Sequence, residues 1–233
     1  MKGPARTVPD AAAAAAGFSL VEMMVVTAVL SILAGVAVPS LLGSRAVANE
    51  SAVLATMRSI ATAETQARLS GVVDLDHDGI GEGVGLGELC GAEDLRNGAG
   101  RLRPPGLSAS LGALDANGRA HQKGYLLCLY LPDAGGVGIA ASAANASSID
   151  ADLAENAWTC LAWPLQRGNT GNATFFVNQT GELLVCRTTS YSGATAVPPA
   201  GAALVGVPPD VIVDAPPAVG TTGADGNLWQ PAR

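Results

Sequence analysis

The sequence predicts an α+β protein in which a long N-terminal helical stem packs on a small antiparallel β-sheet head. Residues 23–44 form a run of 22 residues without a charge. Apolar residues then recur with helical spacing as far as residue 67, and strand-like runs follow after residue 120. The first pattern predicts the stem and the second predicts the sheet of the head.

The uncharged run is long enough to cross a membrane. At about 1.5 Å per residue, a helix of 22 residues is roughly 33 Å long, which matches a bilayer core of about 30 Å. Lys2 and Arg6 favour a cytoplasmic N-terminus, so that everything after Arg45 lies across the membrane. Hydropathy alone is equally compatible with an uncleaved signal anchor. Secretory cleavage at Gly17 is not expected, because the apolar run follows this small residue instead of preceding it.

Beyond the apolar run, the helix is predicted to continue to a stop at Gly71. Its apolar positions share one face, which is expected to pack on the head: Ala46, Val53, Met57, Ile60 and Ala67. Its charged positions are expected to be exposed: Arg45, Glu50, Arg58, Glu64 and Arg68. Glu64 and Arg68 are one turn apart and are predicted to pair. Gly35, Pro39 and Gly43 weaken the helix, which predicts a local bend in an assembled filament.

The head is predicted from apolar runs bounded by turn residues. Four such runs predict strands at residues 124–131, 158–163, 174–177 and 182–187. Residues 178–181 read NQTG and form a hairpin link between the last two. The four strands are expected to form an antiparallel sheet that packs on the stem helix.

These signals divide the chain into four segments. They are a leader at 1–17, an N-terminal helix at 18–70 with its membrane part at 18–44, a head at 71–190 and a tail at 191–233. The tail is rich in proline, alanine and glycine, which predicts an extended or partly disordered segment. Within it, residues 211–213 are expected to add an edge strand, and Trp229 is expected to anchor the end.

The junction between leader and helix has a specific sequence. Residues 17–39 read GFSLVEMMVVTAVLSILAGVAVP. This stretch closely resembles the class III signal of type IV pilins and type II secretion pseudopilins. The resemblance implies that a prepilin peptidase cleaves after Gly17 and methylates the new amino terminus at Phe18. Pro39 also falls where this family has a proline. The pattern around Trp163 and residues 175–182 resembles, more weakly, the heads of pseudopilin-like proteins.

Glu22 is a single carboxylate at the edge of the apolar helix. A charge removed from water needs a partner, because an unpaired carboxylate in a low-dielectric environment is strongly unfavourable. The resemblance implies that Glu22 of an incoming subunit neutralises the Phe18 amine of its neighbour in the filament core. The alternative is that Glu22 only complements the dipole at the start of its own helix.

An acidic loop at 74–88 follows the stem helix. Asp74, Asp76 and Asp78 alternate before Gly79, which places carboxylates at the first, third and fifth loop positions. The glycine allows a turn that brings the carbonyl of Ile80 to a cation. This order resembles the first half of an EF-hand loop and predicts calcium binding.

The resemblance to an EF-hand ends within the loop. The twelfth position is Gly85 instead of a glutamate, so Glu82 or Glu88 would have to replace the missing ligand. We expect a site formed by Asp74, Asp76, Asp78, Ile80 and Glu82. The alternative is a solvated acidic loop without a cation.

The chain has four cysteines, in a part expected to face an oxidising compartment. Two disulfides are therefore predicted, with three possible connectivities. Among these, we favour Cys160 with Cys186 and Cys90 with Cys128. A zinc site is not expected, because no two of these cysteines have the close spacing of a zinc module.

Composition argues against two classes of function. The net charge of −7 disfavours binding to phosphate backbones, so no nucleic-acid partner is expected. With two histidines and no nucleophile motif, the chain offers no catalytic residues, and it is not expected to be an enzyme.

The resemblance implies a structural filament subunit that supports protein secretion. Its partners would be copies of itself, other pilin-like subunits, the prepilin peptidase and an inner-membrane assembly platform. It would be a single-pass protein of the bacterial inner membrane with a periplasmic head, and then part of a periplasmic pseudopilus or a surface pilus. The alternatives are a minor pilin that serves adhesion or DNA uptake, and a membrane-anchored monomer with a calcium-binding head.

Overall fold

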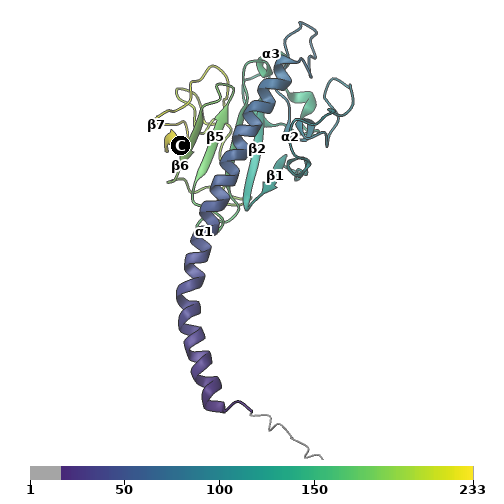
Figure 1. The fold of residues 1–233 in the computed structure, drawn as a ribbon. Coiled ribbons are helices and arrows are strands. Elements are labelled where there is room, and N and C mark those ends of the chain that lie inside the picture. The colour runs from purple at the N-terminus through teal and green to yellow at the C-terminus, as the bar shows by residue number, and fades with distance from the viewer. Residues whose placement is uncertain (1–16, 233) are drawn as a thin grey trace, which may run out of the picture. The chain divides into compact units, whose positions relative to one another are not determined.

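The computed structural model describes residues 17–232 (Figure 1). Residues 1–16, which make up nearly all of the predicted leader, lie outside the described part of the chain. The chain divides into two compact units, Met1–Leu41 and Leu42–Arg233. Helix α1 (Leu20–Leu69) contributes residues to both units, and each unit is described by itself below.

In the first unit, α1 carries polar groups that are satisfied within the helix. The hydroxyl of Thr27 donates to the carbonyl of Met23 at 2.9 Å, and the hydroxyl of Ser31 donates to the carbonyl of Thr27 at 2.7 Å. Such internal hydrogen bonds are required of hydroxyls in a hydrocarbon environment. The helix is assigned without a break through Gly35, Pro39 and Gly43.

In the second unit, the rest of α1 lies across one face of the sheet (Figure 1). The face predicted from the apolar spacing is confirmed, since all five of its residues are buried: Ala46, Val53, Met57, Ile60 and Ala67. Most of them join one apolar cluster with Leu127 and Phe175 of the sheet. The helix ends at Leu69, and Gly71 follows with a φ of 59°, as expected for a C-terminal stop.

The predicted exposed face is wrong at two positions. Arg45 and Arg58 are exposed, but Glu50 and Glu64 are buried. Glu50 accepts hydrogen bonds from the N–H groups of residues 172 and 173 and pairs with Arg187 at 2.9 Å. Glu64 does not form the predicted pair with Arg68, because its carboxylate instead accepts the N–H of Val84 at 3.1 Å.

The sheet has eight strands, and all neighbouring strands are antiparallel. Its order is β1-β2-β4-β5-β6-β8-β7, with β3 also paired to β2. The strands are β1 (Arg119–Gln122), β2 (Tyr125–Pro132), β3 (Gly138–Ala140), β4 (Thr159–Pro164), β5 (Thr174–Asn178), β6 (Leu183–Cys186), β7 (Thr221–Thr222) and β8 (Leu228–Pro231). The four strands predicted from sequence correspond to β2, β4, β5 and β6. Two one-turn helices, α2 (Leu86–Leu89) and α3 (Ala151–Ala154), lie in the connections.

The tail covers the opposite face of the sheet from α1. Leu204, Ile212 and Trp229 are buried in a second apolar cluster with Trp163 and Phe176. The last strand, β8, pairs with β6 and so extends the sheet. The prediction of an extended or partly disordered tail is therefore wrong, although the expected anchoring by Trp229 is confirmed. The edge strand expected at 211–213 is only a single bridge from Val211 to Val137.

All four cysteines are buried free thiols, so the two favoured disulfides are not formed. The reason is the alternation of side chains along each strand. Cys90 and Cys160 belong to the cluster on the α1 face, whereas Cys128 and Cys186 belong to the cluster on the tail face. Each predicted pair would therefore have to connect opposite faces of the sheet, beyond the reach of a disulfide.

Candidate functional site

The segment that would be processed lies at the start of α1. Gly17 and Phe18 precede the helix, and Phe18 is 77% exposed. Ser19 and Glu22 then cap the helix reciprocally. The Val21 N–H donates to the Ser19 hydroxyl at 3.3 Å, and the Ser19 N–H donates to the Glu22 carboxylate at 2.8 Å. The junction between Gly17 and Phe18 is thus exposed next to an ordered first turn.

This cap places the charge of Glu22 beside the Phe18–Ser19 peptide. The capping bond uses Oε2 of Glu22, so the second oxygen is available to another donor. The capping role considered from sequence is therefore present, and it is compatible with pairing to an amine of a second subunit. Pro39 lies within α1, and its predicted role in assembly remains a prediction.

The apolar side chains after the cap are exposed in the described chain. They include Leu20, Met24, Val25, Leu30, Ile32 and Leu33. Among the described residues, α1 is the one helix that is long and apolar enough to cross a membrane, judged by length and composition. Such a surface requires a bilayer or other apolar helices around it.

The acidic loop gathers the three predicted aspartates. One carboxylate oxygen from each of Asp74, Asp76 and Asp78 lies within 4.8 Å of the others. Local hydrogen bonds hold the turn, since Asp74 accepts the N–H groups of His77 and Gly79, and Asp78 accepts that of Ile80. Binding of a cation by the carbonyl of Ile80 remains a prediction.

Glu82 does not join this group. Its side chain is buried, and its carboxylate accepts the N–H of Leu75 at 2.7 Å. A second group contains Asp76 together with Asp152 and Glu155, whose oxygens also lie within 4.8 Å of one another. Sequence reasoning missed these two residues because they lie more than seventy positions along the chain from Asp78, the last of the three aspartates. The sequence did contain one signal for this part of the site, because Asp150 is a typical N-cap residue. It caps the short helix α3, which contains Asp152 and is followed by Glu155.

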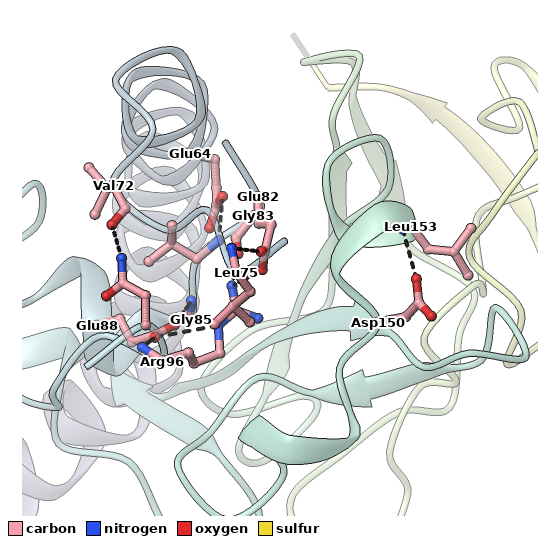
Figure 2. A network of polar contacts seen from close by, with 12 residues as sticks. Glu64, Val72, Leu75, Glu82, Gly83, Gly85, Glu88, Arg96, Asp150 and Leu153 are labelled. Atoms are coloured by element: carbon pink, nitrogen blue, oxygen red, sulfur yellow. Dashed lines mark hydrogen bonds and ion pairs between the residues drawn. The ribbon is translucent and has the colours of Figure 1, made fainter. Parts of the chain in front are cut away.

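A buried polar network lies between α1 and the loop (Figure 2). The Arg96 guanidinium lies 3.5 Å from the carboxylates of Glu82 and Glu88 and donates to the carbonyl of Gly83. Glu88 also accepts the N–H groups of Gly85 and Arg96. Three buried glutamates, including Glu64, thus surround one buried arginine. The arrangement fixes the loop against the helix.

Within this network, the pKa of Glu64 is strongly shifted. Burial raises the pKa of Glu64 from 4.5 to about 8, and the nearby charge of Glu88 adds to the effect. The Val84 N–H and the positive charge of Arg96 oppose this shift but do not cancel it. The Glu64 carboxyl is therefore protonated at neutral pH. Burial also raises the pKa of Glu82.

One comparison with known proteins identifies the N-terminal segment. Residues 13–38 match the family model of the prokaryotic N-terminal methylation motif. This motif is the signature of the prepilin-type signal of type IV pilins and pseudopilins, which confirms the resemblance inferred from residues 17–39. No curated protein and no solved structure matches the chain.

The motif and the fold together define a class of protein. A long apolar N-terminal helix followed by an antiparallel sheet is consistent with a pilin-like α+β fold. The motif supports a type IV pilin-like or pseudopilin subunit and points to a structural role. It also suggests anchoring in a membrane and processing by a prepilin peptidase.

Proposed function

We propose that the protein is a structural subunit of a type II secretion pseudopilus or a closely related type IV filament, and that it supports protein secretion. The observation that carries this proposal is the match at 13–38 to the methylation motif. Its cleavage position falls at an exposed junction directly before a capped apolar helix. Cleavage after Gly17 leaves Phe18 as the methylated amino terminus.

In this proposal, α1 has two successive environments. Before assembly, the apolar run lies in the inner membrane with residues after Arg45 in the periplasm. During assembly, the exposed apolar side chains pack against the same helix of other subunits, which keeps them out of water. The assembly platform and the other pilin-like subunits are the partners that this transfer requires.

The charge of Glu22 sets the register of this packing. Between apolar helices, an ionised carboxylate and an amine attract each other far more strongly than in water, while either one alone is penalised. Only an axial position that places Glu22 beside the Phe18 amine of a neighbour satisfies both groups. The pair therefore selects one arrangement of subunits.

Two other functions share part of this evidence. A minor pilin that serves adhesion or DNA uptake would carry the same motif and helix but would bind its target through the second unit. A membrane-anchored monomer would keep the bond between Gly17 and Phe18. The motif match favours filament subunits over the anchored monomer, because the motif has no role in a chain that is not processed.

Deletion of the gene tests the proposed role in secretion. A strain without the protein is expected to retain in its periplasm proteins that the parent strain secretes, and the wild-type gene should restore their release. The variant Gly17→Val should not restore it, because it blocks processing. Normal secretion together with a loss of surface attachment or DNA uptake would instead support the minor-pilin function.

A further inference from the structure

The turn between β1 and β2 and the loop between β4 and β5 lie against the first turns of α1 in the second unit (Figure 1). The N–H of Leu165 donates to the carbonyl of Gly124 at 2.9 Å, which joins the loop to the turn. The side-chain amide of Asn49 donates to the carbonyl of Thr170 at 2.9 Å, which joins the loop to the helix. This end of the sheet is therefore fixed beside residues 45–50.

Two arginines are held at this end of the sheet. Arg187 directly follows β6 and pairs with the buried Glu50 at 2.9 Å, while its own side chain is 65% exposed. Arg167, in the loop between β4 and β5, donates to the carbonyls of Asn172 and Arg187. Contacts within the second unit therefore fix both guanidinium groups before any partner binds.

Two further cations lie at the same end and have no acidic partner. Arg45 and Lys123 are exposed, and within residues 17–232 neither of them forms an ion pair. Lys123 directly precedes Gly124 in the turn, and Arg45 lies about one helical turn before Asn49 on α1. Although the chain has a net charge of −7, this end of the sheet is positively charged. We call the four cations the basic surface: Arg45, Lys123, Arg167 and Arg187.

The basic surface begins where the uncharged run of α1 ends. Arg45 is the first charged residue after residues 23–44, so it marks the boundary between the membrane and water. Apolar side chains accompany the cations, since Val47 is 64% exposed and Leu165 is 39% exposed. Val47 also lines one groove together with Arg187. Cations mixed with exposed apolar side chains are typical of surfaces that rest on a membrane, because the cations attract lipid phosphates and the apolar groups enter the headgroup region.

We propose that the basic surface binds the phosphate groups of anionic phospholipids in the membrane that α1 spans. Each lysine or arginine close to an anionic membrane strengthens binding about fivefold, so the four cations act together. A subunit must then break this contact before its helix leaves the bilayer for a filament. The inference rests on the membrane anchoring in the proposed function, and it does not depend on cleavage at Gly17.

A fluorescent dye on the loop between β4 and β5 measures this contact in the full chain reconstituted in lipid vesicles. The variant Asn169→Cys offers an exposed thiol for labelling, since the four native cysteines are buried. The vesicles consist of neutral phosphatidylcholine, with or without anionic phosphatidylglycerol, and both kinds contain a quencher bound to lipid headgroups. Quenching is expected to be stronger in the anionic vesicles. The difference should disappear at about 1 M salt, where the Debye length is about 3 Å.

Removal of the two unpaired cations tests which residues bind the lipid. The double variant Arg45→Gln, Lys123→Gln should lose the difference between the two kinds of vesicle, because its attraction to anionic lipid falls on the order of 25-fold. The matched control is Arg101→Gln, Arg103→Gln, which removes the same charge from two exposed arginines. Their loop is bonded to residue 72, beyond the other end of α1, so this control should keep the wild-type difference.

The possible outcomes separate this inference from the proposed function. Equal quenching in both kinds of vesicle, or equal effects of the two double variants, would overturn the inference and leave the filament role in place. Protein that does not float with either kind of vesicle would overturn the membrane anchoring as well. Equal quenching together with a loss of cross-linked multimers in Arg45→Gln, Lys123→Gln would overturn lipid binding and assign the basic surface to a neighbouring subunit.

Discussion

Replacing Glu22 with glutamine is expected to leave the protein inserted and processed but to reduce its incorporation into filaments by at least about 100-fold. Removal of one partner from a buried charge pair costs about 3–5 kcal/mol, because the other charge stays behind without compensation. Here the remaining charge would be the Phe18 amine of the neighbouring subunit. Incorporation is measured by the share of the protein that chemical cross-linking in intact cells captures in multimers, relative to the monomer in membranes.

The choice of glutamine separates the two roles of Glu22. Glutamine preserves the reciprocal cap with Ser19, whereas alanine removes both the cap and the charge. If pairing across subunits matters, both variants assemble poorly. If only the cap matters, Glu22→Gln assembles normally and Glu22→Ala does not, which would refute the pairing. Ser31→Ala is the matched control, since this hydroxyl bonds only within its own helix.

Replacing Glu64 with glutamine is expected to stabilise the protein at alkaline pH. The folded protein holds a proton on Glu64 up to about pH 8, whereas the unfolded chain loses it near pH 4.5. Folding therefore binds a proton between these values, so the free energy of unfolding falls as the pH rises through this window. At pH 8, the variant should avoid a cost of about 4 kcal/mol. Urea denaturation of residues 42–233 at pH 5 and pH 8 measures the difference.

The neutral variant keeps the surroundings of Glu64 intact. Its amide oxygen still accepts the N–H of Val84, and Arg96, Glu88 and Arg68 remain in place. The variant Asp210→Asn, which removes an exposed carboxylate, should retain the wild-type decline between pH 5 and pH 8. An equal decline in Glu64→Gln would mean that Glu64 is ionised when buried, with its charge compensated by Arg96.

The sequence predicted those parts of the fold that local patterns encode. Val53, Met57 and Ile60 could be assigned to the packed face because helical spacing places them on one side. Strands β2, β4 and β5 could be found because they are buried along their whole length and therefore read as apolar runs. The methylation motif at 13–38 was recognised because processing depends on the sequence around the cleavage position itself.

The remaining features depend on tertiary contacts. Strand β1 reads RAHQ, which contains no apolar run, and it becomes a strand through its pairing with β2. Glu64 looks like an exposed helical residue until the loop that carries Val84 and Arg96 folds over it. The contribution of Glu155 to the acidic cluster likewise follows from the attachment of α3 to Gly83.

Mass spectrometry of the protein from native membranes determines whether its amino terminus has been cleaved and methylated. We predict a mature chain of 216 residues that begins at Phe18 and carries one methyl group on its terminal amine. A chain that retains Met1 and the intact bond between Gly17 and Phe18 would contradict the account and would favour the membrane-anchored monomer.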